Sequence, residues 1–141
     1  MGENIYPNDP TASNNTPANL LGWSVAINGN GTRIISGGVG TDTPVANNGY
    51  VRVYDYNDNV WTQVGNDIYG PSSEAQFGYT VAISDDGSII AVGGHNANVC
   101  IYNYKIPSPD EWSSGNVIKG EDTDQQNNKY YWIQLGESIP S

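Results

Sequence analysis

The chain has one histidine, His95, and one cysteine, Cys100, residue types that often serve as general base and thiol nucleophile. His95 follows a strand-like run in the turn "GGHN", and Cys100 lies inside a predicted strand. No His/Cys set has metal-ligand spacing, no glycine-rich loop precedes a helix, and no serine lies in a nucleophile elbow. Fifteen acidic residues would supply a carboxylate pair by chance. The sequence therefore predicts no enzymatic activity.

The densest acidic cluster consists of Glu121, Asp122 and Asp124, in "GEDTDQQNN". It is a weak candidate for an ion site, because it lacks the glycine and the terminal glutamate of an EF-hand loop. The two turns "NGNG" (28–31) and "SDDG" (84–87) are too short to wrap around calcium and are expected to be plain hairpin turns. No cofactor and no metal are expected.

Aromatic side chains are the best candidates for ligand contact. Trp23 and Tyr79 occupy equivalent places in the two halves of the chain, whereas Trp112 lies in a long loop and has no counterpart. These three residues are the predicted binding residues. Trp61 and Trp132 also match each other, and this repeated placement favours packing over ligand contact.

The elements that carry these residues repeat along the chain. "GWSVAINGNGTRIISGG" (22–38) returns as "GYTVAISDDGSIIAVGG" (78–94), and each copy reads as a strand, a tight turn and a second strand. "VRVYDY" (51–56) and "VCIYNY" (99–104) form a matched third strand. "WTQVG" (61–65) and "WIQLG" (132–136) form a matched fourth strand.

The sequence thus predicts an all-β fold of two four-stranded antiparallel repeats, the size and pattern of β-propeller blades. Residues 1–19 are a lead-in that echoes the end of a preceding blade, 20–69 form blade 1, and 70–141 form blade 2. Blade 2 carries a polar loop at 105–129, expected to lie on the side of the A–B turns and to be removable without unfolding the chain. Here A to D are the four strands of a blade.

Two known kinds of repeat share these features. Phe77-Gly78, followed by Gly93-Gly94-His95, resembles the FG-GAP repeat of integrin α-type propellers, and the "VAISDDGSIIAVGG" stretch resembles WD40-like and YVTN-like blades. The resemblance covers 20–139 and implies a propeller; it is weak for function, because such repeats serve many tasks. The chain departs from the integrin pattern at Leu21, which replaces the phenylalanine, and in lacking the Ala-Pro ending.

The charge composition of the chain excludes some classes of binding partner. Fifteen acids against five bases give a net charge of −10, which disfavours nucleic acid and anionic membranes. The chain has no apolar run long enough to span a membrane, and its N-terminus lacks the features of a signal peptide. The compartment stays open: a cell surface, an extracellular site or a virion would suit an excerpt of a longer protein.

Two blades cannot close a propeller, which needs about four to eight. We therefore expect either self-association, with a six-bladed trimer favoured, or a longer chain that supplies the other blades. The expected function is a non-enzymatic binding or scaffold module whose loops recognise protein or glycan. The alternative is a sugar-binding lectin of the small-repeat propeller type.

Overall fold

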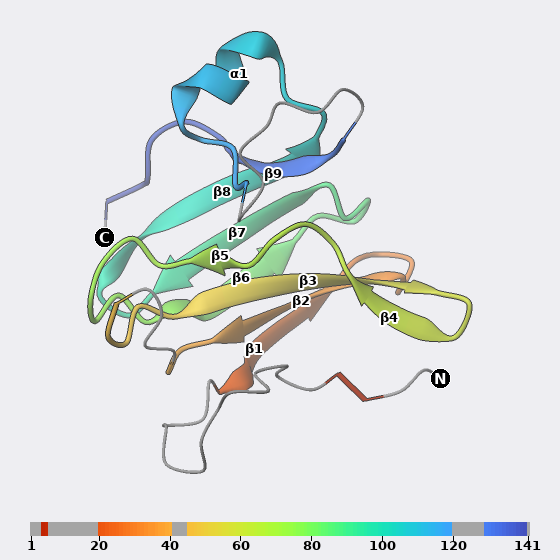
Figure 1. The fold of residues 1–141 in the computed structure, drawn as a ribbon. Coiled ribbons are helices and arrows are strands. Elements are labelled where there is room, and N and C mark those ends of the chain that lie inside the picture. Colours follow the sequence, from red (N-terminus) through yellow and green to blue (C-terminus); the bar gives the residue numbers. More distant parts are fainter. Residues whose placement is uncertain (1–3, 6–19, 41–44, 120–128, 141) are drawn as a thin grey trace.

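The computed structural model describes residues 4–5, 20–40, 45–119 and 129–140, which form two antiparallel β-sheets and one short helix (Figure 1). Sheet 1 has the strand order β1-β2-β3-β4, with β5 pairing with β3 as well. Its strands are β1 (Leu21–Ile27), β2 (Arg33–Gly38), β3 (Tyr50–Asn57), β4 (Val60–Gln63) and β5 (Ile68–Tyr69). The chain is all-β, as the sequence predicts.

Sheet 2 repeats this layout with the order β6-β7-β8-β9. Its strands are β6 (Phe77–Ile83), β7 (Ile89–Gly94), β8 (Ala97–Lys105) and β9 (Tyr131–Gln134). The strand pairing confirms the alignment of the two halves: Tyr54 faces Gln63 in sheet 1, and Tyr102 faces Gln134 in sheet 2. The two sheets are therefore equivalent over most of their four strands; they differ where β7 meets the start of β8, because the register there shifts between Val92 and Gly94, whereas β2 and β3 pair without a shift.

Equivalence extends to the irregular parts. β1 and β6 each begin with a bulge, at Gly22 and Gly78, where φ is +96° and +88°. The turns after β1 and β6 are tight hairpins held by polar side chains. In the first, Asn28 accepts the backbone N–H of Arg33 at 2.9 Å; in the second, the Ser84 hydroxyl accepts that of Ile89 at 3.0 Å. Short polar side chains that bond their own turn explain why both sequences fold back here.

The two sheets pack against each other, and the core lies between them (Figure 1). Ile35, Val51 and Val53 come from sheet 1, and Ile90, Val92 and Trp132 from sheet 2, all nearly or fully buried. The Trp132 indole N–H donates to the Val64 carbonyl at 3.0 Å, a hydrogen bond between the sheets.

Gly37 allows the two sheets to approach each other closely. A Cβ added there would collide with the carbonyl oxygen of Gly78 in the facing strand. The Ser24 hydroxyl donates to the same carbonyl at 2.6 Å. The packing of the sheets thus depends on a small residue beside a hydroxyl donor.

The sheets are stacked in the same direction, so their buried faces differ. Successive side chains along a strand point to opposite sides of the sheet. Sheet 1 uses the side of Ser24, Ile35 and Gly37, which we call its inner face; sheet 2 uses the side of Val92 and Trp132. This buried side is the inner face of sheet 2. The opposite side of each sheet points away from the core, and we call it the outer face. This front-to-back stacking leaves two outer faces of different kinds.

The segment 105–119 contains a short helix that the sequence analysis did not predict. It leaves β8 beside the A–B turn, as expected, because the Tyr104 N–H donates to the Ser88 carbonyl at 2.9 Å. It then forms α1 (Pro109–Ser114) and runs along the edge of β9, where Val117 pairs with Ile133. Val117, Tyr131 and Ile133 form a small buried cluster against Trp112. The described part of this loop therefore packs as part of the fold, and the expectation that the chain stays folded without residues 108–127 remains a prediction.

Among the described residues, no helix is long and apolar enough to cross a membrane.

Candidate functional site

Three aromatic rings form a row at the end of the molecule where β1 and β6 begin. Trp23 and Tyr79 have ring centroids 5.5 Å apart, and Tyr79 lies 5.3 Å from His95. Trp23 is 51% exposed and Tyr79 is 38% exposed. The structure thus brings together the two predicted residues from equivalent strands and adds His95.

The bulges explain how this row arises. At each strand start the N–H of the aromatic residue bonds the carbonyl three positions earlier, Trp23 to Leu20 at 3.0 Å and Tyr79 to Gln76 at 3.2 Å. Because both sheets carry the same local turn, stacking them sets the two aromatic residues side by side. His95 comes from the short turn between β7 and β8. Sequence reasoning missed it because it was considered only as a catalytic group, yet its place right after Gly93-Gly94 put it beside the start of the paired strand β6.

Exposed aromatic faces of this kind bind apolar faces of sugars or aromatic and aliphatic side chains of proteins. The row of Trp23, Tyr79 and His95 holds no carboxylate and no lysine or arginine. Its chemistry is therefore stacking and hydrogen bonding.

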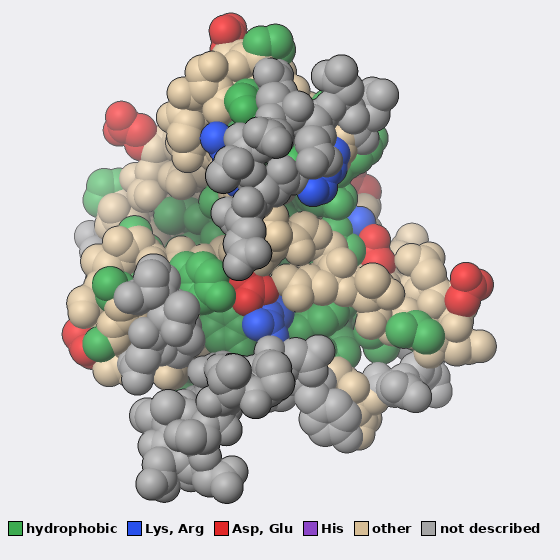
Figure 2. Space-filling view, in the orientation of Figure 1, with side chains coloured by type: hydrophobic (Ala, Val, Ile, Leu, Met, Phe, Trp, Pro, Cys, Tyr) green, Lys and Arg blue, Asp and Glu red, His purple; other side chains and the backbone are tan. Residues whose placement is uncertain are grey.

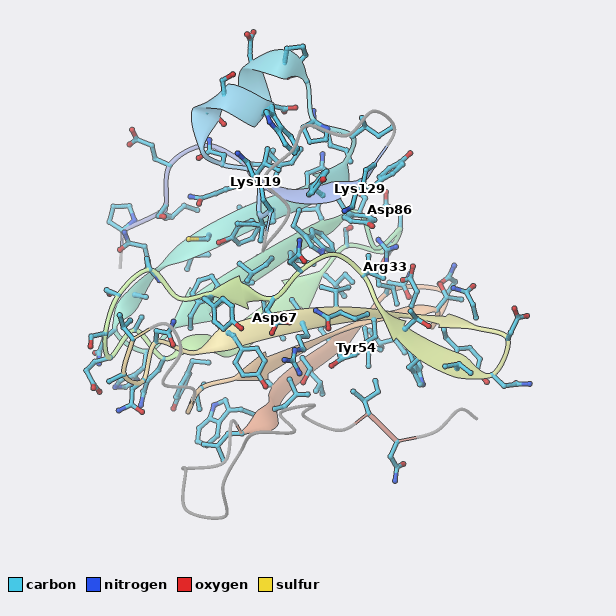
Figure 3. All side chains as sticks on the ribbon, viewed as in Figure 1. Arg33, Tyr54, Asp67, Asp86, Lys119 and Lys129 are labelled. Atoms are coloured by element: carbon cyan, nitrogen blue, oxygen red, sulfur yellow. The ribbon has the colours of Figure 1, made fainter. Side chains whose placement is uncertain are left out.

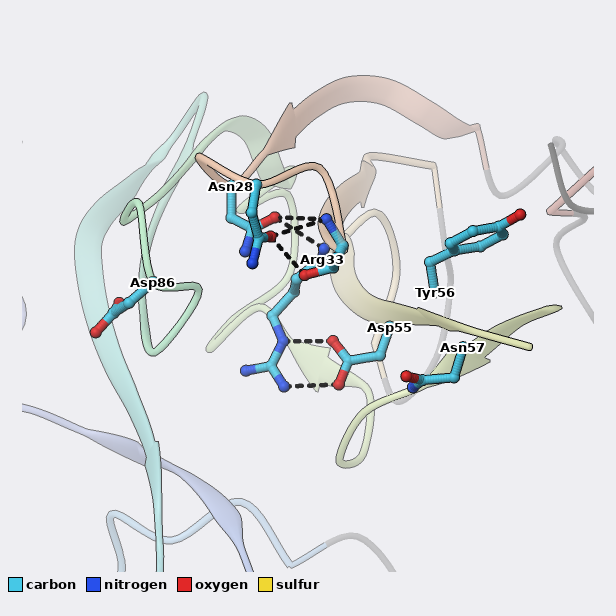
Figure 4. Close-up of a pocket in the computed structure, with 8 residues that line it drawn as sticks. Asn28, Arg33, Asp55, Tyr56, Asn57 and Asp86 are labelled. Atoms are coloured by element: carbon cyan, nitrogen blue, oxygen red, sulfur yellow. Dashed lines mark hydrogen bonds and ion pairs between the residues drawn. The ribbon is translucent and has the colours of Figure 1, made fainter. Parts of the chain in front are cut away.

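A polar pocket of about 250 Å³ lies at the opposite end of the strands, beside the A–B turns (Figure 4). Arg33 dominates it: its guanidinium makes a two-pronged ion pair with Asp55 and donates to the Gly87 carbonyl of sheet 2 at 2.9 Å. The guanidinium also lies 5.2 Å from the centre of the Tyr104 ring. The lining residues are Asn28, Asn30, Thr32, Arg33, Asp55, Tyr56, Asn57 and Asp86.

Neighbouring groups keep Arg33 and Asp86 of this pocket in their charged forms at neutral pH. The hydrogen bond to Asp55 raises the pKa of Arg33. The backbone N–H of Ser88, with the Ser84 and Ser88 hydroxyls, lowers the pKa of Asp86 to about 2. Neither group exchanges a proton near neutral pH. Arg33 connects the two sheets through its bonds to Asp55 and to the Gly87 carbonyl. Neither Arg33 nor Asp86 is suited to acid–base catalysis at neutral pH.

Trp112 lies half-buried on α1. The helix begins with a capping box, in which Ser108 and Glu111 bond each other's backbone N–H, and it ends at Gly115. The Trp112 ring meets Tyr131 edge to face at 5.3 Å, and the Lys119 ammonium lies 4.9 Å from its centre. Figure 3 labels Lys119 near β9. Trp112 therefore already has packing partners, and a ligand role for it stays a prediction.

The ion-site candidates Glu121, Asp122 and Asp124 lie outside the described residues. Within the described ranges, no group of three or more His, Cys, Asp or Glu side chains is placed to hold a metal. Asp86 and Asp85 of the second A–B turn do not form a cage: Asp86 accepts its hydrogen bonds from the two serines of its own turn.

No protein-family model, no curated protein and no solved structure matches this chain.

Proposed function

We propose that this chain is a non-enzymatic scaffold module built from two β-propeller blades. One observation carries the proposal: the two equivalent sheets stack front to back. A further sheet of the same kind could therefore stack on either outer face in the same way. A sandwich of two sheets packs matching inner faces and is complete, whereas front-to-back stacking continues until it closes.

The outer faces support this reading. The outer face of sheet 1 carries Val25 and Ile27, exposed at 66% and 56%, on the side that the equivalent residues Val81 and Ile83 of sheet 2 turn toward the core. The outer face of sheet 2 carries Thr80 and Gly93, the equivalents of Ser24 and Gly37. At these positions each outer face therefore carries residues like those of the equivalent buried face.

Closure by copies of the chain satisfies both faces at once. A head-to-tail interface that closes makes a ring, and two blades per chain give four, six or eight blades for two, three or four copies. Three copies, with six blades, lie in the middle of this range. In a longer protein, neighbouring blades of the same chain would take the place of the copies.

Light scattering on the purified chain tests the scaffold. A mass near 46 kDa, three times the 15.2 kDa of one chain, supports the trimer. A cooperatively melting species of 15.2 kDa at every concentration would refute self-assembly of this chain.

The second candidate is a lectin, favoured by the exposed row of Trp23, Tyr79 and His95. Glycan-array binding that is lost in Trp23→Ala and Tyr79→Ala, and kept in Tyr130→Ala, would support it. Tyr130 is a suitable control because its ring is 50% exposed and stacks on Tyr104, outside the row. An array without binding at millimolar sugar would leave recognition of protein as the role of the loops.

A further inference from the structure

The contact between the two sheets has a vacant counterpart on the surface. Within the chain, Trp132 lies over Gly65: a Cβ added to Gly65 would be 2.6 Å from the Trp132 ring. Trp132 is fully buried and bonds the Val64 carbonyl. The side chain thus fills a position over a glycine that has no side chain of its own.

Both halves of this contact occur a second time without their partners. Trp61 is the equivalent of Trp132 and lies half-buried on the outer face of sheet 1, stacked on Tyr56 at 5.0 Å, as Trp132 is stacked on Tyr104 at 4.9 Å. Its indole N–H has no hydrogen bond to any described residue. Gly136 is the equivalent of Gly65, with φ at +66° against +71°. Around Gly136 no atom of the described residues lies within 4 Å of an added Cβ.

We propose that Trp61 of one copy packs over Gly136 of a second copy and donates its indole N–H to the Leu135 carbonyl. This inference rests on the proposed function, since it names the contact by which copies would join. The occupant of the Gly136 site is a second copy of this chain, because the chain itself carries the tryptophan, in the right strand and with the same stacked tyrosine, on its opposite outer face.

Other groups on the two outer faces have matching roles. The Thr80 hydroxyl, equivalent to that of Ser24, donates to the carbonyl of Gly22 in the second copy, as Ser24 does to Gly78. The Asp85 N–H faces the Gly29 carbonyl of the second copy, as the Gly29 N–H bonds the Asp85 carbonyl within the chain at 3.0 Å. Three hydrogen bonds of the internal interface thus have donors and acceptors ready between copies.

The helix α1 does not block this contact. It packs over Tyr131 and Ile133, whose equivalents in sheet 1 are Val60 and Thr62. Val60 is 51% exposed and Thr62 is exposed, so sheet 2 does not cover these positions in the internal interface. A second copy stacked in the same way therefore needs no space where α1 lies.

The test uses two single variants and a matched control. Trp61→Ala removes the inserted ring, and Gly136→Asn fills the site with a residue that tolerates positive φ. Gly115→Asn is the control, because Gly115 also has positive φ, +82°, and open space around it. Circular dichroism of each dilute variant checks the fold, and a dilution series by light scattering gives the dissociation constant of the assembly.

We expect the dissociation constant to rise at least about tenfold for Trp61→Ala and for Gly136→Asn, as for a central tryptophan of an interface. Gly115→Asn should assemble like the parent chain. Mixing the two variants should give a two-chain species, because Trp61 of the Gly136→Asn chain fits over the intact Gly136 of the other. Neither variant alone contains both halves of the contact.

The outcomes separate the two proposals. If the parent chain assembles and both variants assemble equally well, or if their mixture holds nothing heavier than either alone, the Trp61 contact is refuted and the scaffold stands. If the parent chain is a monomer at every concentration, self-assembly fails and the contact with it.

Discussion

Gly37 and Gly93 hold equivalent places in β2 and β7, and they differ in what faces them and in their pairing: Gly37 pairs with Val51, whereas Gly93 lies at the register shift between β7 and β8. Gly37 lies between the sheets: an added Cβ would collide with the Gly78 carbonyl oxygen and lie 2.8 Å from its carbon and 2.6 Å from the Ser24 hydroxyl. At Gly93 the nearest atoms are the Thr80 hydroxyl at 2.8 Å and a Val99 methyl at 3.7 Å. Neither glycine has positive φ, so alanine at either position meets no backbone strain of that kind.

The two alanine variants should therefore differ in stability. In Gly37→Ala the backbone of the facing strand cannot move without separating the sheets, and overpacking of this kind costs about 1–3 kcal/mol. Loss of the hydrogen bond from Ser24 to Gly78 adds about 1 kcal/mol. We expect the free energy of unfolding to fall by about 3 kcal/mol, which lowers Tm by about 10 °C for a chain of this size. Gly93→Ala should change it by less than about 0.5 kcal/mol, because the Thr80 side chain can rotate.

Urea unfolding followed by tryptophan fluorescence measures this difference. The chain should be dilute, because assembly would add its own binding energy to the apparent stability. Equal m-values for the two variants would show that the same surface is exposed on unfolding. If both variants lose the same stability, or if Gly37→Ala loses less than 1 kcal/mol, the front-to-back stacking at Gly37 described above is wrong.

Three further predictions follow from single sites. Burial raises the pKa of Tyr50 to about 12, and its hydroxyl has no hydrogen bond to a described residue. Because a tyrosine in the unfolded chain ionises near pH 10, the free energy of unfolding should fall as the pH rises above about 10. In thermal melts, Tyr50→Phe should make this fall less steep and leave the stability at pH 7 unchanged or slightly higher. Calcium should be dispensable, so melting in EDTA and in millimolar calcium should agree within about a degree, and a large rise with calcium would contradict this. Deletion of residues 108–127 should destabilise the chain by about 3 kcal/mol or more, because it uncovers Tyr131 and Ile133; an unchanged urea midpoint would show that α1 contributes nothing.

The repeat made the fold predictable. Each half of the chain gave an independent copy of the same alternation, so the register of the fourth strand followed from matching Trp61 to Trp132. The division of that strand was not predicted: Gly65 and Gly136 interrupt it, and its second part pairs separately, as Ile68 does with Val51. A glycine at the same place in both repeats was the available signal.

The site was only partly predictable, because the residues that complete it come from connections. Pairing Trp23 with Tyr79 required only the repeat, whereas adding His95 required knowing how the turn after β7 lies against β6. The helix at Trp112 did have a local signal: Ser108 followed three residues later by Glu111 is a capping box, with proline at the first helical position. The sequence analysis did not predict this helix, because its residues are mostly polar and it is too short to show the apolar periodicity of a helix.

One difference between the repeats bears on how an exposed face can also be a docking face. Sheet 1 carries Arg52 and Asp67 where sheet 2 has Cys100 and Ser138. Arg52 and Asp67 form a forked ion pair, with N–O distances of 2.7 and 2.8 Å. Figure 3 labels Asp67, and Figure 2 shows acidic and basic side chains among hydrophobic ones in the same region of the view.

The Arg52 and Asp67 side chains are only 14% and 15% exposed, and each charge already satisfies the other. Covering the pair therefore costs less than burying two separate charges. Val25 and Ile27, which lie on the same face of sheet 1, supply apolar area to bury. The outer face of sheet 1 is thereby compatible with both solvent and a second sheet. The inner face of sheet 2, which packs against sheet 1 within the chain, has only the small Cys100–Ser138 contact at 3.1 Å in this place. This contrast is what we expect if one interface forms during folding and the other forms afterwards, between chains that are already folded.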